Sequence, residues 1–149
     1  HCTSRGGKLN VHQDFDYNPE TSLCRQINVL VFLNENWMSD WKGDLELWDK
    51  NLKQKQVSIK PDFNTMVIFN TNDFTFHGHP EPHQFPLDFP RTSLAFYYYT
   101  STPPSNTERK RNNTTKTKYI PSKDEKINLK GISIKSKVGY LLRRWTNLG

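Results

Sequence analysis

The segment KLNVHQDFD at residues 8–16 places a histidine and a carboxylate one residue apart. Side chains on a β-strand alternate between its two faces, so we expect His12 and Asp14 to point to the same side. An imidazole and a carboxylate on one face form part of the two-histidine, one-carboxylate triad that binds iron(II) and leaves coordination positions open. Asp16 continues the same face and is a rival to Asp14. Short motifs of this kind also occur on exposed edge strands, so a third ligand is needed to distinguish a metal site from an exposed polar face.

Three histidines follow within seven positions in FTFHGHPEPHQFP, residues 74–86. Alternation places His77 on the strand face opposite the two phenylalanines that precede it. His79 is in phase with His77, but Pro80 comes directly after it, and a proline cannot donate to the strand ladder. We therefore predict that the strand ends here, that His79 and His83 lie in a loop, and that His77 is the third ligand. Zinc bound by the histidine-rich loop alone is the alternative.

The segment PRTSLAFYYYT at residues 90–100 supplies a candidate for binding an anion. Arg91 and Ser93 lie two residues apart and therefore share one face of a predicted strand. A guanidinium presents a planar fork of donors that matches a carboxylate. An arginine that enters a strand and pairs with a surface acid is the alternative.

Short β-type runs separated by turn residues must position these side chains, and their spacing predicts an all-β or mainly β sandwich or barrel. No segment before residue 100 has a helical period over three turns. The predicted strands are Leu9–Phe15, Gln26–Asn34, Asp44–Trp48, Val57–Ile59, Thr65–Asn70, Phe74–His77 and Thr92–Thr100.

The composition changes near residue 101, which predicts a core over residues 1–100 and a basic linker and tail over 101–149. The core holds nine Lys and Arg against twelve Asp and Glu, whereas the tail holds twelve against three. A basic tail could contact nucleic acid, but a solvated tail is the expected form. Apolar residues at the spacing of a short amphipathic helix follow near the end of the chain. They are Val138, Leu141, Leu142 and Trp145.

The length of 149 residues corresponds to one domain. The longest apolar run, INVLVFL at residues 27–33, is far shorter than the roughly 20 residues that a bilayer span needs. Cys2 and Cys24 show no paired spacing, so two free thiols in a reducing compartment are expected. With no signal peptide at its start, the chain is predicted to be cytoplasmic and not a membrane protein.

Five segments over residues 6–100 resemble, in order, the prolyl 4-hydroxylase-like branch of the iron(II)/2-oxoglutarate-dependent oxygenases. The segments are GGKLNVHQDFDYN, RQINVLVFLNENW, GDLELWD, FNTMVIFNTNDFTFHGHP and RTSLAFYYYT. The resemblance implies a double-stranded β-helix, a jelly-roll and cupin-like core. It also implies hydroxylation of an unactivated C–H bond in a peptidyl substrate, with proline as a candidate, and release of succinate and CO2. Iron(II) would be the cofactor, 2-oxoglutarate and O2 the cosubstrates, and ascorbate a candidate reductant.

Carried over residue by residue, the resemblance makes His12, Asp14 and His77 the iron ligands. Arg91 would bind the distal carboxylate of 2-oxoglutarate with the help of Ser93. Asn28 is a further candidate for this cosubstrate, and one of the tyrosines at 97–99 is expected to face it. The candidates for a substrate groove are Trp37, Trp41 and His79.

The chain departs from the family pattern before His12. Relatives carry helices and a further strand in this region, whereas only eleven residues precede His12 here. We therefore expect a core without N-terminal helices, because either the upstream part is absent from this chain or the fold is trimmed, and a barrel that lacks a strand would expose a sheet edge. Gly43-Asp44 stands where relatives have a glycine pair. The alternative function is a catalytically silent jelly-roll module that binds a metal or a partner.

Overall fold

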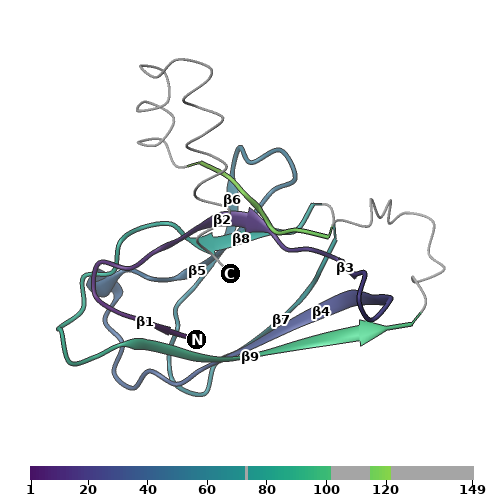
Figure 1. The fold of residues 1–149 in the computed structure, drawn as a ribbon. Coiled ribbons are helices and arrows are strands. Elements are labelled where there is room, and N and C mark those ends of the chain that lie inside the picture. Colours follow the sequence, from purple (N-terminus) through teal and green to yellow (C-terminus); the bar gives the residue numbers. More distant parts are fainter. Residues whose placement is uncertain (73, 102–114, 122–149) are drawn as a thin grey trace, which may run out of the picture.

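The computed structural model describes residues 1–72, 74–101 and 115–121, which form two antiparallel five-stranded sheets facing each other (Figure 1). Within these residues the helical element is a single 3-10 turn, η1 (Ser39–Trp41). The strands are β1 (Cys2–Thr3), β2 (Leu9–Gln13), β3 (Tyr17–Asn18), β4 (Leu23–Phe32), β5 (Leu45–Trp48), β6 (Lys55–Ile59), β7 (Met66–Asn70), β8 (Phe76–His79), β9 (Arg91–Thr100) and β10 (Lys118–Tyr119).

The first sheet has the order β1-β9-β4-β3, and β7 pairs with β4 beside β3. The long strands β4 and β9 run against each other from Cys24 opposite Thr100 to Phe32 opposite Ser93. The second sheet has the order β10-β2-β8-β5-β6. From β4 to β10 the strands alternate between the two sheets except at the β5–β6 hairpin, which is the arrangement of a jelly roll and confirms the predicted double-stranded β-helix core.

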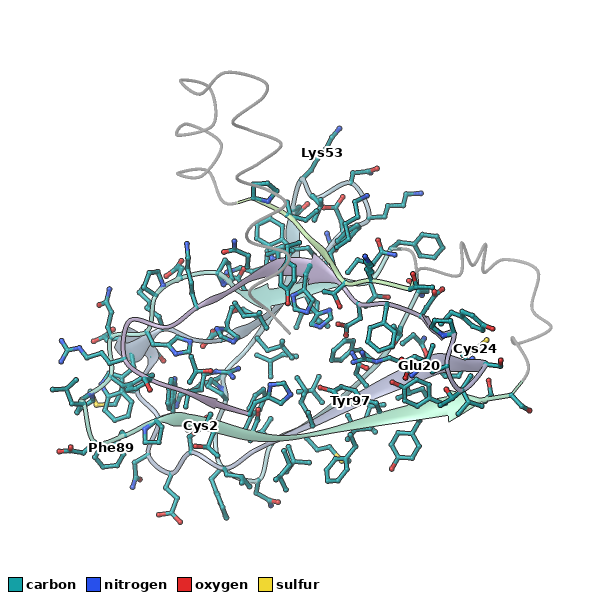
Figure 2. All side chains as sticks on the ribbon, in the orientation of Figure 1. Cys2, Glu20, Cys24, Lys53, Phe89 and Tyr97 are labelled. Atoms are coloured by element: carbon teal, nitrogen blue, oxygen red, sulfur yellow. The ribbon has the colours of Figure 1, made fainter. Side chains whose placement is uncertain are left out.

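Side chains from both sheets fill the space between them (Figure 2). The apolar part of this core consists of Phe32, Leu45, Val67 and Phe69. Strand β7 shows why: its burial alternates strictly, so that Val67 and Phe69 point inward while their neighbours are exposed. Besides this apolar cluster, many of the buried side chains are polar or charged.

The outer face of the β9-β4-β7 sheet is also apolar. Register places Val29 between Phe96 on β9 and Ile68 on β7, and Val31 between Leu94 and Met66. Of these residues, Met66, Ile68, Leu94 and Phe96 are exposed. Hydrophobic side chains therefore lie on both faces of this sheet.

All seven predicted strands are present, with ends shifted by a few residues. One shift matters for the site: β8 runs to His79, so the prediction that His79 lies in a loop was wrong. Pro80 favours an extended conformation in the residue before it, and its missing N–H falls just beyond the last strand residue. His83 does lie outside the strands, but it is buried.

Three short strands, β1, β3 and β10, were not predicted. β1 precedes β2 and pairs with β9 (Cys2 opposite Thr92), so a short strand does come before the one that carries His12. β10 comes from the basic segment and pairs with β2, with Tyr119 opposite His12.

The predicted helix around residues 138–145 lies outside the described residues. Among the residues that are described, no helix has the length and apolarity to cross a membrane.

Candidate active site

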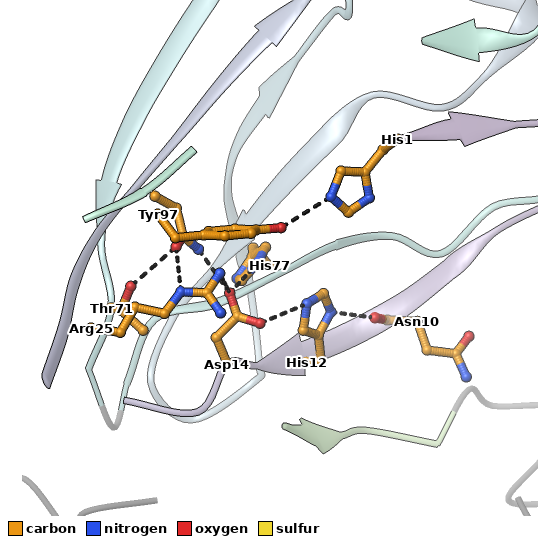
Figure 3. Close-up of polar contacts among 9 residues, drawn as sticks. His1, Asn10, His12, Asp14, Arg25, Thr71, His77 and Tyr97 are labelled. Atoms are coloured by element: carbon orange, nitrogen blue, oxygen red, sulfur yellow. Dashed lines mark hydrogen bonds and ion pairs between the residues drawn. The ribbon is translucent and has the colours of Figure 1, made fainter. Parts of the chain in front are cut away.

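His12 and His77 are cross-strand neighbours on β2 and β8, and Asp14 follows directly after β2 (Figure 3). One ligand atom from each of the three residues lies within 4.8 Å of the others. The Nε2 atom of His12 is 3.5 Å from Asp14 Oδ1, and that of His77 is 3.5 Å from Asp14 Oδ2. The fold therefore brings together the three predicted ligands, although His77 lies 63 residues after Asp14 in the sequence. The rival Asp16 is buried nearby but does not belong to this group.

The protonation states of these side chains suit a metal ion. Burial and, to a lesser extent, the neighbouring His12 lower the pKa of His77 to about 4 although Asp14 opposes them, so that its imidazole is neutral near pH 7. Burial alone would raise the pKa of Asp14, but the hydrogen bond with His12 and the charges of His77 and Arg25 hold it well below its usual range. A neutral imidazole and an ionised carboxylate are the forms that bind iron(II).

The backbone fixes the ring of His12. Its Nδ1 lies 2.9 Å from the carbonyl oxygen of Asn10, which accepts the hydrogen bond and leaves Nε2 directed at the carboxylate. Metal-binding histidines commonly have their second nitrogen held in this way. The donor set of two imidazoles and one carboxylate therefore fits iron(II), with His12 in a defined orientation.

Arg25 is a site residue that the sequence did not predict. Its side chain is 4% exposed, and its Nη2 donates to Asp14 Oδ2 at 3.0 Å. Asn28 donates to the same oxygen at 2.7 Å, so the side chain expected near the cosubstrate is bound to the carboxylate of the candidate metal site. The ring of Tyr97 lies over the guanidinium, with 3.9 Å between the guanidinium carbon and the ring centroid. Of the tyrosines at 97–99, Tyr97 is thus the one whose ring covers Arg25 at this site.

Arg91 is equally buried at the start of β9, on the same face as Ser93. Its Nε donates to the carbonyl oxygen of Gly43 at 2.7 Å, and its guanidinium lies over the ring of Phe32. No carboxylate of the described residues lies within 4.0 Å of it. Burial lowers the pKa of Arg91 to about 10, an effect that Asp44 partly opposes. Near pH 7 the interior therefore contains a guanidinium cation that has no anionic partner among the described residues.

The family model of the 2OG-Fe(II) oxygenase superfamily matches residues 1–99. This chain belongs to that superfamily. No curated protein sequence matches the chain. Membership in the 2OG-Fe(II) oxygenases implies iron(II) as the metal and 2-oxoglutarate (2OG) as the cosubstrate, and the cluster of His12, Asp14 and His77 fits iron binding.

In this member of the superfamily, two buried histidines lie next to Arg91. The Nε2 of His83 is 3.1 Å from the Nδ1 of His79, and the backbone N–H of Leu9 donates to the same Nδ1 at 3.2 Å. Burial, followed by the charge of Arg91, lowers the pKa of His79 to about 3 and that of His83 to about 4. Both rings are therefore neutral at pH 7. Within the described residues, His77 is the one histidine of segment 74–86 that joins a group of possible metal ligands, so nothing supports the zinc alternative.

The two tryptophans proposed for a substrate groove pack against the loop that carries His83. Trp37 is 3% exposed, and its ring lies 5.5 Å from that of Trp41 and 5.4 Å from that of Phe85. Its Nε1 donates to the carbonyl oxygen of Lys42. Next to it, Gly43 has a φ of +86°, and a Cβ here would come within 2.9 Å of His83 Nε2. Glycine is thus required where the chain turns to present its carbonyl to Arg91.

Proposed function

We propose that this protein is an iron(II)- and 2OG-dependent dioxygenase that hydroxylates an unactivated C–H bond of a peptidyl substrate. The observation that carries the proposal is the convergence of His12, Asp14 and His77 in an interior that also contains Arg91, which has no carboxylate partner among the described residues. Either feature alone has a structural explanation. Together they supply a place for a cation and a place for a carboxylate between the same two sheets.

His12, Asp14 and His77 would hold iron(II), which supplies the redox chemistry when it is bound with 2OG and O2. One oxygen atom of O2 ends in succinate and the other in the hydroxyl group of the product, while 2OG loses CO2. Arg91 would bind the distal carboxylate of 2OG, and Ser93, two residues along the same face, would assist through its hydroxyl group. A buried carboxylate is costly to desolvate unless it is paired, so Arg91 also selects for an anionic cosubstrate.

The peptidyl substrate, with proline as the first residue to test, rests on the resemblance of the five segments to the prolyl 4-hydroxylase-like branch. Ascorbate is the reductant to include. Trp41 and His79 remain candidates for a substrate groove. Two free thiols, Cys2 and Cys24, support a reducing compartment such as the cytoplasm. We do not propose that the basic tail binds nucleic acid.

The test is to load the protein with iron(II) without oxygen, to add 2OG, ascorbate and O2, and to measure succinate with and without proline-containing peptides. We expect slow succinate formation without peptide and faster formation with a substrate. A folded protein that binds iron but forms no succinate under any of these conditions would be a silent metal-binding module, which is the alternative function.

A matched pair of variants tests the assignment of the ligands. His77→Ala should lose stoichiometric iron binding, whereas His79→Gln, on the same face of the same strand, should keep it. Iron binding by direct titration is the measurement, because it does not depend on finding the substrate. If His79→Gln lost the iron and His77→Ala kept it, the assignment of His77 would be wrong.

A further inference from the structure

The carboxylate of Asp14 belongs to a network of hydrogen bonds in which its two donors also bind each other. Its Oδ2 accepts from Arg25 Nη2 at 3.0 Å and from Asn28 Nδ2 at 2.7 Å. Arg25 Nε in turn donates to Asn28 Oδ1 at 2.8 Å, and the Thr71 hydroxyl donates to the same oxygen at 3.3 Å. Asp14, Arg25 and Asn28 are therefore each oriented by the other two.

A bulge in β4 brings Arg25 and Asn28 together. In a regular strand, residues three apart point to opposite faces. Opposite β9, however, Arg25 pairs with Tyr99 and Ile27 pairs with Tyr98, so that Gln26 is an inserted residue. The insertion shifts the phase by one residue, and both side chains point to the interior. Bulges commonly redirect a side chain beside a functional site.

The network distinguishes the two carboxylate oxygens of Asp14. Oδ2 has two donors, one of them a guanidinium cation, and a metal ion bound to the same oxygen would be repelled by that cation. Arg25 is also confined by aromatic rings, since the guanidinium carbon lies 3.9 Å from the centroid of Tyr97 and 5.1 Å from that of Phe15. The arginine therefore cannot easily move away from Oδ2 when an ion binds. Oδ1 is the oxygen left for the metal.

We propose that Arg25 and Asn28 are positioning residues that restrict Asp14 to a single metal bond through Oδ1. Without them the carboxylate can rotate and bind the ion through both oxygens, which fills a coordination position that 2OG or O2 requires. This inference rests on the proposed function, because it assigns a role to residues around the same metal. It concerns the number of open positions on the metal, which can be measured without turnover.

The experiment uses Mn(II) as the probe and counts metal-bound waters from the broadening of its EPR signal in ¹⁷O-enriched water. Arg25→Gln should bind Mn(II) with one fewer water than the wild type. The affinity of the Mn(II)-loaded protein for 2OG should fall about 10- to 100-fold, the usual effect of removing a partner of a metal ligand. Arg5→Gln makes the same change at an exposed position and should alter neither value.

Two further variants keep the test decisive if Arg25→Gln does not fold. Arg25→Lys keeps the charge but cannot donate to Asp14 and Asn28 at once, and Asn28→Ser removes the second donor to Oδ2. We expect the loss of a metal-bound water in both, with a smaller loss of 2OG affinity than in Arg25→Gln. An unchanged water count and 2OG affinity in folded variants would overturn the positioning role. If wild-type protein failed to bind Mn(II) at all, the proposed function itself would fall.

Discussion

Arg25 and Arg91 are both 4% exposed, yet only Arg25 has a carboxylate partner in the part of the chain that the structure describes. Arg25 donates to Asp14 and Asn28 and lies against the ring of Tyr97. Arg91 donates to one backbone carbonyl and lies against Phe32. The two guanidinium groups are thus similar in burial and in aromatic contact and differ in charge compensation.

The difference indicates two kinds of role. A buried charge is costly unless it is paired, so a fold that needed Arg91 only for stability would be expected to supply an acid. Arg25 neutralises a carboxylate that the protein itself provides, and it therefore belongs to the framework around the candidate metal site. Arg91 carries a charge that a bound anion would neutralise. Four experiments test whether this distinction is real.

The largest expected effect is on stability. In metal-free protein without 2OG, Arg25→Met should lower the free energy of unfolding by about 3 kcal/mol, because it leaves the Asp14 carboxylate buried without its cation. Arg91→Met should change it by about 1 kcal/mol or less, since the lost hydrogen bond is offset by removal of an unpaired charge. Urea denaturation measures both values. Equal losses in the two variants would mean that Arg91 has a structural role like that of Arg25.

The second effect is on binding of the cosubstrate. Arg91→Gln should weaken 2OG binding by about 2 kcal/mol or more, roughly 30-fold, because the distal carboxylate would be buried without a cation. The affinity for Mn(II) should be unchanged, since Arg91 contacts none of the three candidate ligands. Calorimetry without oxygen measures both affinities. An Arg91→Gln variant that bound 2OG as tightly as the wild type would remove Arg91 from the site.

A smaller effect concerns the aromatic ring over Arg25. Tyr97→Leu should reduce the free energy of unfolding by about 1 kcal/mol, because the cation–π contact with the guanidinium is lost. Tyr98→Leu is the matched control, since the next residue along β9 points to the exposed outer face. Equal values in urea denaturation would show that Tyr97 contributes area and no specific contact with the cation.

The candidate ligands could be predicted from the sequence because regular alternation places them. His12 and Asp14 share a face, and the cross-strand pairing of His12 with His77 needs only that β2 and β8 be neighbours. Arg25 could not be found in this way. Alternation from Ile27 assigns Arg25 to the outer face, and only the inserted Gln26 reverses that assignment. A bulge leaves no clear signal in one sequence.

The two faces of β9 show a similar limit to what can be predicted from the sequence. Leu94, Phe96 and Tyr98 are as apolar as core residues, yet they lie on the outer face. The inner face instead carries Arg91 and Ser93, so hydrophobicity alone would have placed this strand the wrong way round. The short strands β1, β3 and β10 were missed because two residues are too few to show a period. Their pairing depends on neighbouring strands that are distant in the sequence.

The smallest expected effect links Arg91 to His83. Burial and then the charge of Arg91 hold the pKa of His83 near 4 in the folded protein, against an ordinary value of 6.5. The stability that neutral His83 contributes is therefore complete above pH 6.5 and is lost as the pH falls through about 4. Among the described residues, His79 shares a hydrogen bond with His83, and Arg91 is the charged group that acts on the pKa of this ring.

Removing the charge of Arg91 should raise the pKa of His83 toward its ordinary value and make stability less dependent on pH. Between pH 6.5 and pH 4, Arg91→Gln should therefore lose less stability than the wild type, by up to about 1 kcal/mol, whereas Arg5→Gln should behave as the wild type does. Saturating 2OG with Mn(II) at pH 6.5 should likewise raise the pKa of His83, because a bound carboxylate compensates the same charge. A wild-type pH profile that Arg91→Gln leaves unchanged would mean that another group already neutralises Arg91, and the contrast with Arg25 would then no longer hold.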